Sequence, residues 1–283
     1  MKKLLSALFV LCLLPLAAQA GESSHESALD RIIRTGVIRC GYYVFPPATY
    51  RDINTNAMSG LSVDIMNRIA ERAALKVEWT EEVTFGNWVP AMQSNRFDMV
   101  CTSMWPELTM GKAVLFTHSL FYSGLSPAVR ADDARFNAST RLDRLNQPDI
   151  TMLTQEGNMT DSVARAAFPN AKFYPLPPES DPGSYYQTLL TRKADAMLTD
   201  RNGVHEFNKT NNGAIVLVDP AHPVKLQSFP LVVNRGEPEL RDFLNLAIDE
   251  MNNSGEIDNI LRKWESEPGL TYLRVAQPFQ PVQ

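Results

Sequence analysis

The residues best placed to bind a ligand follow predicted strands. Asp200 comes directly after residues 194–199, which we interpret as a buried strand, so its carboxylate is expected at the strand end. Thr102 and Ser103 stand at the end of a second such segment, at residues 97–102. Ligand sites in α/β proteins form at the carboxyl ends of parallel strands. A carboxylate and small hydroxyl groups there would recognise a small polar molecule.

Motifs for catalysis or metal binding are absent from the sequence. The histidines show no metal-ligand spacing: they are His25, His118, His205 and His222. There is no phosphate-binding Gly-Lys-Ser/Thr loop and no Gly-x-Ser-x-Gly nucleophile elbow. We therefore expect no metal, no cofactor and no catalytic residue.

Residues 1–20 have the features of a secretory signal peptide. Two lysines precede an apolar stretch at residues 4–16, and residues 18–20 form an Ala-Gln-Ala cleavage site. No later segment offers the roughly 18 consecutive apolar residues that a membrane helix needs. We expect cleavage after Ala20, a periplasmic location and no membrane insertion after cleavage.

The composition is that of a globular, acidic protein. The chain has 283 residues, of which 44% are hydrophobic and 21% charged, as in ordinary folded domains. The formal net charge is −5, and loss of two lysines with the signal peptide makes it −7. An acidic surface argues against nucleic acid as a partner.

Two cysteines remain after cleavage, Cys40 and Cys101. They are too few for a disulfide framework in a chain of this length. Both fall on predicted strands of one sheet, so a bridge and two separate thiols are both compatible with the sequence. We favour separate thiols, because free cysteine is commonly a small buried hydrophobic residue.

Hydrophobic periodicity predicts an α/β protein. Strands and helices alternate in the first half, which is the order of βαβ units on a parallel sheet. The expected elements are helix 27–34, strand 37–41, helix 65–73, strand 76–79, helix 88–94 and strand 97–102. A second, smaller set follows, with strands at 150–153, 194–199 and 214–218 and helices at 159–168 and 185–192. Helices at 238–252 and 257–264 close the fold, with an extended arm after Pro268.

The order of these segments resembles the family 3 extracytoplasmic solute-binding proteins, the polar amino-acid receptors of bacterial ABC importers. The resemblance is carried by DRIIRTGVIRCG, PPATYRD, GLSVDIMNRIAERA, FGNWVPAMQSNRFDMV, FTHSLFYSG, TRKADAMLTDR and NRGEPELRDFLNLAIDEMNNSGEIDNILRKW. It implies the type II periplasmic-binding-protein fold, two lobes that are each a mostly parallel sheet flanked by helices. Two crossing strands, near residues 123–129 and 229–233, would join them. The implied boundaries are 28–125 with 231–270 for lobe one, 126–230 for lobe two and 271–283 for a C-terminal tail.

The resemblance also implies a set of ligand contacts. Phe45 and Phe85 match positions where aromatic rings sandwich the ligand, and Asp200 matches the acid that accepts its ammonium group. The matching polar positions are Thr102 and Ser103 in lobe one and Asn158 and Thr160 in lobe two. The last two follow Gly157, where backbone N–H groups at a helix N-terminus hold an anion. Core packing of the rings, and an N-cap role for Asp200, remain alternatives.

The sequence departs from the family at three positions. Met110 stands where an arginine commonly binds the ligand carboxylate, and Trp105 stands where a small polar residue is usual. Near Tyr42 and Tyr43 the family often has an acid. Several aromatic rings could therefore gather near Asp200: Tyr42, Tyr43, Phe45, Phe85, Trp88 and Trp105. Such rings suit an amine, a guanidinium or a quaternary ammonium group by cation–π attraction, with Glu107 as a second negative partner. The alternative is that half of them belong to the core.

The function implied is a monomeric receptor without catalytic activity. It would bind an amino acid or a related amine by hinge closure and present it to the permease of an ABC transporter. Two other functions fit the same fold. One is a periplasmic enzyme similar to cyclohexadienyl dehydratase, and the other is a free sensory protein that presents its ligand to a membrane kinase.

Overall fold

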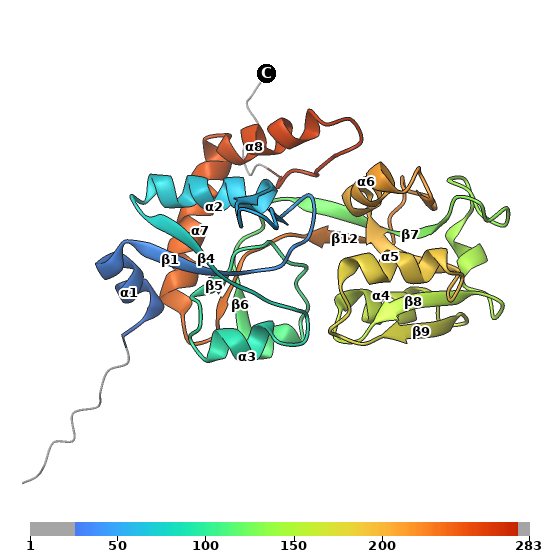
Figure 1. Ribbon diagram of the computed structural model, residues 1–283, viewed down its shortest axis with the longest axis horizontal. Helices are drawn as coiled ribbons and strands as arrows, with labels where there is room; N and C mark the ends of the chain where they lie inside the picture. The colour runs from blue at the N-terminus through green and yellow to red at the C-terminus, as the bar shows by residue number, and fades with distance from the viewer. Residues whose placement is uncertain (1–25, 277–283) are drawn as a thin grey trace, which may run out of the picture.

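The computed structural model describes residues 26–276, which form two lobes side by side, each built around one sheet (Figure 1). The predicted signal peptide and residues 277–283 lie outside the described residues. Across residues 26–276, no helix combines the length and the hydrophobicity of a membrane span.

The first sheet has the strand order β4-β1-β5-β13-β6. Its strands are β1 (Val37–Tyr42), β4 (Lys76–Glu82), β5 (Met99–Val100), β6 (Val114–Phe116) and β13 (Val232–Asn234). β1 runs parallel to β4 and β5, whereas β13 is antiparallel to β5 and β6. β13 therefore returns to this sheet from a distant part of the chain.

Helices cover both faces of the first sheet. They are α1 (Ala28–Thr35), α2 (Leu61–Arg72), α3 (Trp88–Gln93), α7 (Pro238–Asn253) and α8 (Glu256–Glu265). One core cluster joins apolar residues of α1, α2, α7 and α8 to the sheet, and another joins it to α3. Ser27 accepts a hydrogen bond from the backbone N–H of Asp30 at the start of α1, and Gly36 ends that helix at φ 70°. A small hairpin of β2 (Tyr50–Arg51) and β3 (Met58–Ser59) lies between β1 and α2.

The second sheet has the order β11-β7-β10-β8-β9, with β12 also paired to β7. Its strands are β7 (Tyr122–Arg130), β8 (Thr151–Gln155), β9 (Lys172–Leu176), β10 (Ala196–Asp200), β11 (Ile215–Leu217) and β12 (Lys225–Ser228). β8 is parallel to β9 and β10, while β7 is antiparallel to β10, β11 and β12.

Both faces of the second sheet are also covered by helices, α4 (Met159–Ala167) on one and α5 (Pro182–Leu190) with α6 (Arg201–Thr210) on the other. Successive residues of β10 explain this arrangement. Ala196 and Leu198 pack in the core cluster with α4, whereas Met197 packs with α5 and α6. Alternate side chains of a strand point to opposite faces, so a strand buried on both is continuously apolar.

Two chain segments connect the lobes and hydrogen-bond to each other. The N–H of Leu120 donates to the carbonyl of Phe229 at 3.0 Å, and the N–H of Phe229 donates to the carbonyl of Phe121 at 3.0 Å. β7 and β12 continue this pairing into the second lobe. The connection is thus a two-stranded ribbon.

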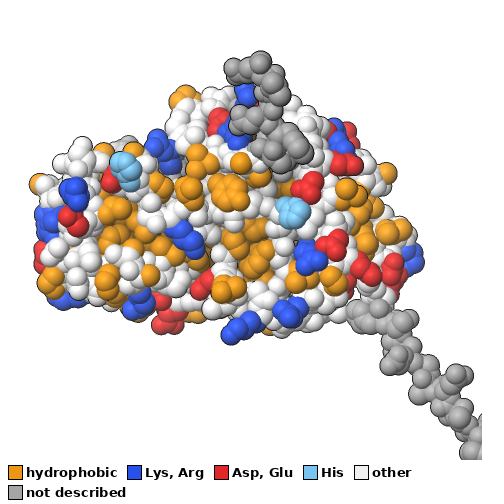
Figure 2. All heavy atoms as spheres, turned by 180° about the vertical axis from the view of Figure 1, so that it is seen from behind, with side chains coloured by type: hydrophobic (Ala, Val, Ile, Leu, Met, Phe, Trp, Pro, Cys, Tyr) orange, Lys and Arg blue, Asp and Glu red, His pale blue; other side chains and the backbone are white. Residues whose placement is uncertain are grey.

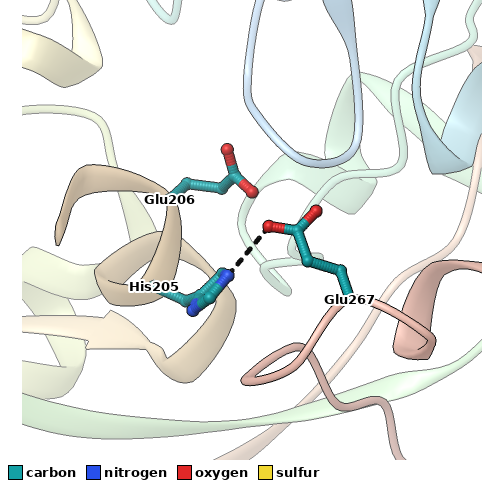
Figure 3. A group of neighbouring side chains, drawn as sticks. All are labelled: His205, Glu206 and Glu267. Atoms are coloured by element: carbon teal, nitrogen blue, oxygen red, sulfur yellow. Dashed lines mark hydrogen bonds and ion pairs between the residues drawn. The ribbon is translucent and has the colours of Figure 1, made fainter. Parts of the chain in front are cut away.

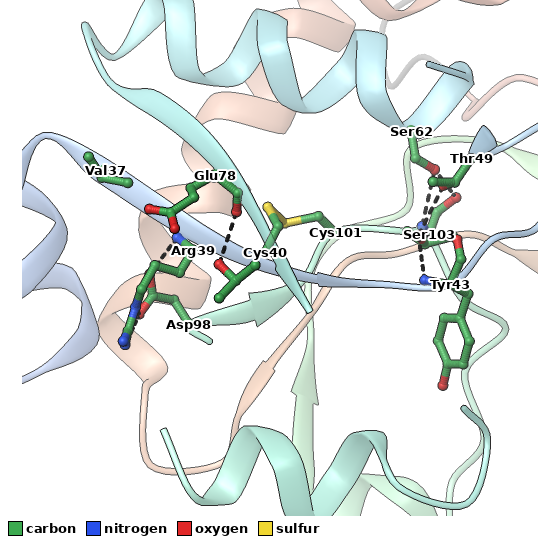
Figure 4. Close-up of a disulfide and its surroundings, with 12 residues drawn as sticks. Val37, Arg39, Cys40, Tyr43, Thr49, Ser62, Glu78, Asp98, Cys101 and Ser103 are labelled. Atoms are coloured by element: carbon green, nitrogen blue, oxygen red, sulfur yellow. Dashed lines mark hydrogen bonds and ion pairs between the residues drawn. A yellow bond between two sulfur atoms is a disulfide. The ribbon is translucent and has the colours of Figure 1, made fainter. Parts of the chain in front are cut away.

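The interpretation of Cys40 and Cys101 as separate thiols is wrong. The two cysteines form a disulfide, with their Cα atoms 5.4 Å apart, and both are fully buried (Figure 4). Cys40 lies on β1 and Cys101 directly follows β5, and these neighbouring strands run parallel. The pairing of β1 with β5 brings the two side chains together. The sequence shows only that each cysteine falls on a predicted strand.

The segment after Pro268 packs on the fold up to the last described residue. Leu270 and Tyr272 are buried, and Tyr272 lies edge-on against Phe121 with ring centroids 5.1 Å apart. Leu273 pairs with Tyr122 at the start of β7. The predicted extended arm is therefore docked beside the connection between the lobes.

Candidate functional site

A cavity of about 170 Å³ lies between the two lobes. The loops after β1, β4 and β5 line it from the first lobe. The second lobe contributes residues after β8, the loop before α5, and parts of α5 and β10. These are mostly carboxyl ends of strands and amino ends of helices, the parts of an α/β sheet where ligands bind.

Most residues predicted for the site line this one cavity. They are Tyr43, Phe45, Phe85, Thr102, Ser103 and Trp105 from the first lobe and Asn158 and Thr160 from the second. Met110 also lines the cavity, while Glu107 does not. Tyr42 and Trp88 are buried in the first lobe instead, with Tyr42 edge-on to Trp79 at 5.8 Å.

Asp200 is the predicted site residue that the cavity does not reach. Its Oδ1 accepts a hydrogen bond of 2.7 Å from the N–H of Gly203, so Asp200 caps α6. The carboxyl group is buried, and burial raises its pKa against the opposing effect of backbone N–H groups from Gly203 and Asn202. Its neighbours Leu198 and Thr199 form the cavity wall.

Hydroxyl groups fix the first lobe's half of the cavity. Thr102 Oγ1 accepts from the N–H of Tyr43 and donates to its carbonyl, both at 3.1 Å, and it lies 3.0 Å from Thr49 Oγ1. The Oγ atoms of Ser103 and Ser62 lie 3.1 Å apart (Figure 4). The polar groups that were predicted to bind ligand are thus already bonded within the protein.

Aromatic rings form much of the cavity wall. Tyr43 and Phe85 have ring centroids 5.0 Å apart, and Phe45 lies edge-on to Trp105 at 6.3 Å. Trp105 also contacts Phe229, from the connection between the lobes, at 6.1 Å. Rings in such clusters can stack on an apolar or cationic ligand group.

Two polar atoms of these rings have no hydrogen-bond partner within the described chain, Tyr43 Oη and Trp105 Nε1. Both atoms are buried. Burial raises the pKa of Tyr43 well above its ordinary value, so the phenol is neutral. Buried polar groups normally have partners, and these two are therefore free to bond a ligand or water.

Loops and helix ends build the second lobe's half. Gln155 Nε2 donates to the carbonyl of Ser180 at 2.8 Å and so holds the loop before α5. Asn158 caps α4 by accepting from the N–H of Thr160 at 3.0 Å. Asp181 caps α5 by accepting from the N–H of Ser184 at 2.9 Å.

The charged residues that line the cavity are all acidic: Glu82, Glu179 and Asp181. Glu82 pairs with Arg51 at 2.8 Å, but no cation pairs with Glu179 or Asp181 in the described part of the chain. Glu179 Oε2 instead accepts a 2.5 Å hydrogen bond from Thr84 Oγ1 across the lobes. Sequence reasoning missed these acids. Asp181 before Pro182 is an N-cap signal that could have been found, whereas Glu179 lies in a loop without a pattern.

A second polar cluster joins the lobes away from the cavity. His205 and Glu206 of α6 meet Glu267, which follows α8, and their possible ligand atoms lie within 4.8 Å of one another (Figure 3). The histidine spacing in the sequence does not reveal this group. Lys209 Nζ lies 3.0 Å from Glu206 and 2.7 Å from Glu267, so a protein cation already neutralises the carboxylates.

Charges elsewhere on the surface are mixed. On the face seen in Figure 2, acidic and basic side chains are interspersed, with hydrophobic side chains between them. This face has no broad basic patch of the kind that binds nucleic acid.

The chain is similar to known proteins in both sequence and fold. The family model for bacterial extracellular solute-binding proteins, family 3, matches residues 38–267. The chain is 28% identical to a cyclohexadienyl dehydratase of Pseudomonas aeruginosa over 192 residues, which cover 67% of this chain and 69% of that protein. It is 23% identical to the L-cystine-binding protein TcyA of Bacillus subtilis, covering 94% and 98%. The crystal structure of the ancestral amino acid-binding protein AncCDT-1, a precursor of cyclohexadienyl dehydratase, superposes with a TM-score of 0.71 at 26% identity, covering 84% and 99%.

Proposed function

We propose that this chain, which belongs to family 3 of the bacterial extracellular solute-binding proteins, is a receptor that binds an amino acid or a related amine between its lobes. The observation that carries the proposal is the cavity, whose wall draws on loops of both lobes. A ligand there touches both lobes only when the cleft is shut, so it binds the closed state more tightly and shifts the population toward it.

The receptor would serve an ABC importer. Family membership supports this, and the ribbon between the lobes is a connection about which they can rotate. In this proposal the chain is exported to the periplasm, loses residues 1–20, remains a monomer and offers its closed form to a membrane permease.

A second candidate is an enzyme of the dehydratase class. The similarity to a cyclohexadienyl dehydratase favours it, and a cavity carboxyl such as Glu179 could act as a general acid in loss of water. The receptor is the stronger proposal, since a carboxylate-rich substrate calls for a basic residue in the wall, and Met110 supplies none. A free sensory protein would need the same binding step and differs only in its partner.

Calorimetric titration tests the receptor. The mature chain, residues 21–283, is titrated with the common amino acids and with small amines, and we expect saturable binding of one of them. Trp105→Ala should weaken that binding at least about tenfold, because it removes an aromatic wall. Trp264→Ala, outside the cavity wall, is the matched control.

An assay of turnover separates the two candidates. The same preparation is incubated with cyclohexadienyl carboxylates of the prephenate type, and the aromatic product is followed by absorbance. If the wild type turns the substrate over and Glu179→Gln does not, the protein is an enzyme and the receptor proposal is wrong. Binding without turnover supports the receptor.

A further inference from the structure

The electrostatics of the cavity are one-sided. Its wall contains three carboxylates and no lysine or arginine, and two of the carboxylates, Glu179 and Asp181, have no cationic partner in the described chain. Lys225, whose Nζ contacts Met159 Sδ at 3.9 Å, is not among the lining residues. A cationic ligand group would compensate this charge, whereas an anionic group would add to it.

Several groups that could hold a carboxylate are already bonded within the protein. Thr102 and Ser103 bond other groups of the first lobe. The N–H of Thr160 at the start of α4 bonds the cap Asn158, and the same first turn carries Asp161, which pairs with Arg165 at 3.0 Å. At the start of α5, Asp181 itself occupies the place of an anion. Neither helix end is left as a free anion site.

The groups that remain free are neutral. Tyr43 Oη and Trp105 Nε1 are buried in the cavity wall without partners. A phenol oxygen can accept a hydrogen bond from an ammonium or guanidinium N–H, and an indole N–H can donate to a hydroxyl, a carbonyl or water. These two neutral groups would not compensate a carboxylate of the ligand buried in the cavity, because a buried carboxylate requires an opposite charge or several hydrogen-bond donors.

From this arrangement we propose that the ligand is an organic cation without a carboxylate, an alkyl amine or alkyl guanidine, and not an α-amino acid. Glu179 and Asp181 hold its positive charge from the second lobe. The rings of Tyr43, Phe85 and Trp105 enclose its carbon chain from the first lobe. The inference rests on the proposed function, because it names the ligand class of the same cavity.

Glu179 is the residue that ties recognition to closure. Its carboxylate belongs to the second lobe and accepts from Thr84 Oγ1 of the first lobe at 2.5 Å. A ligand ammonium at this carboxylate would be held where the two lobes meet. Glu179 therefore selects the ligand charge and contributes to the closed state in which that ligand is bound.

The test uses pairs of compounds that differ only in the α-carboxylate. The mature chain is titrated by calorimetry with arginine and agmatine, lysine and cadaverine, and ornithine and putrescine. We expect the amine of the best-binding pair to bind at least about tenfold more tightly than its amino acid, because the amino acid brings a carboxylate that no cation in the cavity wall compensates. An amino acid that binds as tightly as its amine, or more tightly, overturns the inference and leaves the receptor function intact.

Variants of the wall sharpen the test. Met110→Arg places a cation in the cavity and should shift the preference toward the amino acid. Leu108→Arg, at a side chain that is 93% exposed and outside the cavity wall, adds the same charge and should leave the preference unchanged. Glu179→Gln should weaken binding of the amine at least about tenfold, as expected for a lost charge-assisted contact. Far-ultraviolet circular dichroism and thermal unfolding check that each variant folds.

The remaining outcomes also decide between the claims. Tight arginine binding that Lys225→Met removes would show that this lysine reaches the ligand, and the inference would be wrong. If none of the six compounds binds but a neutral amino acid does, the inference fails and the receptor stands. If no solute binds and a carboxylic acid is turned over, both fail.

Discussion

The two lobes fix their halves of the cavity by different means. In the first lobe the disulfide joins β1 to the end of β5, a few residues before Tyr43 and directly before Thr102. In the second lobe most cavity residues lie on helix caps and a loop, and a partly buried ion-pair network lies at the far end of the sheet. That network joins Arg130, Asp133, Arg135 and Asp195. The first half is rich in aromatic rings, lies beside the disulfide and carries Glu82, which pairs with Arg51. The second half carries Glu179 and Asp181, which have no cationic partner in the described chain, and is held by hydrogen bonds.

This difference suggests that the two lobes contribute to ligand recognition in different ways. A covalent link beside the aromatic residues keeps their positions fixed before ligand arrives, which lowers the entropy cost of binding. A helix cap and a loop place Asp181 and Glu179 on the second lobe, at the side that must approach during closure. The ion-pair network lies at the opposite end of the same sheet, where β7 ends at Arg130 and Asp195 precedes β10. The lobes should therefore fail under different conditions, the first under reduction and the second in acid.

Reduction should produce the largest effect. The disulfide closes a loop with a sequence separation of 61, which corresponds to about 4 kcal/mol of the free energy of unfolding in the chain-entropy description. Urea unfolding of the mature chain with and without reductant measures this loss. In Cys40→Ala/Cys101→Ala, reductant should have no further effect. Equal unfolding midpoints of the oxidised and reduced protein would contradict the role given to the bridge.

Acid should affect the second lobe next. A hydrogen bond from Arg135 lowers the pKa of Asp133 to about 2 from an ordinary value of 3.8. Because the folded-state pKa is the lower one, ionised Asp133 stabilises the fold above pH 4, and this contribution is lost as the pH falls toward 2. It amounts to about 2 kcal/mol. The free energy of unfolding of the wild type and of Asp133→Asn is measured by urea unfolding between pH 4 and pH 2. The contribution of Asp133 is the part of the wild-type loss that is absent in Asp133→Asn.

Asp143→Asn serves as the control for this pH dependence. Its side chain is 69% exposed and, among the described residues, forms an ion pair only with the exposed Arg141, at 3.5 Å. The variant should follow the wild-type stability curve between pH 4 and pH 2 within about 0.5 kcal/mol. An Asp133→Asn variant with the wild-type pH dependence would show that this carboxyl does not anchor the lobe.

The contact across the cavity gives a smaller effect. Thr84→Val keeps the shape of the side chain and removes the hydrogen bond to Glu179, a loss of about 1 kcal/mol for the closed arrangement. Small-angle X-ray scattering without ligand should then show a larger radius of gyration. Thr80→Val, on β4, is the control, because Thr80 bonds within its own lobe. An unchanged radius in Thr84→Val would mean that this bond does not hold the lobes together.

The ion pairs beside the connection should matter least. Glu267→Gln weakens the contacts with His205 and Lys209, in which the side chains are 23–41% exposed, and should cost about 0.5 kcal/mol. Thermal unfolding at low and at molar salt measures it, since salt screens such pairs. A loss of the same size at both salt concentrations would argue against a simple ion-pair effect.

Much of the fold could be predicted because local patterns and tertiary packing agree. Strand 37–41 and helix 238–252 appear within one residue of their predicted ends, as β1 and α7. Strand 97–102 shortens to Met99–Val100, although Phe97 and Cys101 at its flanks remain buried. A run of apolar residues predicts burial well, but it predicts poorly how many of those residues pair within the sheet.

The candidate site could be predicted for its aromatic residues and not for its charges. Phe45, Phe85 and Trp105 are large apolar residues in loops, an unusual placement that marks them. Glu179 is an acid in a Pro-rich loop, where acids are common and carry no signal. Its place opposite Thr84 depends on how two separate lobes meet.

The sequence by itself determined the α/β class and the order of most elements in the two sets of strands and helices, because hydrophobic periodicity and caps act over a few neighbouring residues. The strands β2, β3 and β9 were not expected. Only the tertiary structure decided that Cys40 meets Cys101, that Asp200 turns to cap α6, and that uncompensated carboxylates face the aromatic wall. These features depend on strand register and on the approach of the lobes. Both are set by long-range packing, which no local stretch of sequence encodes.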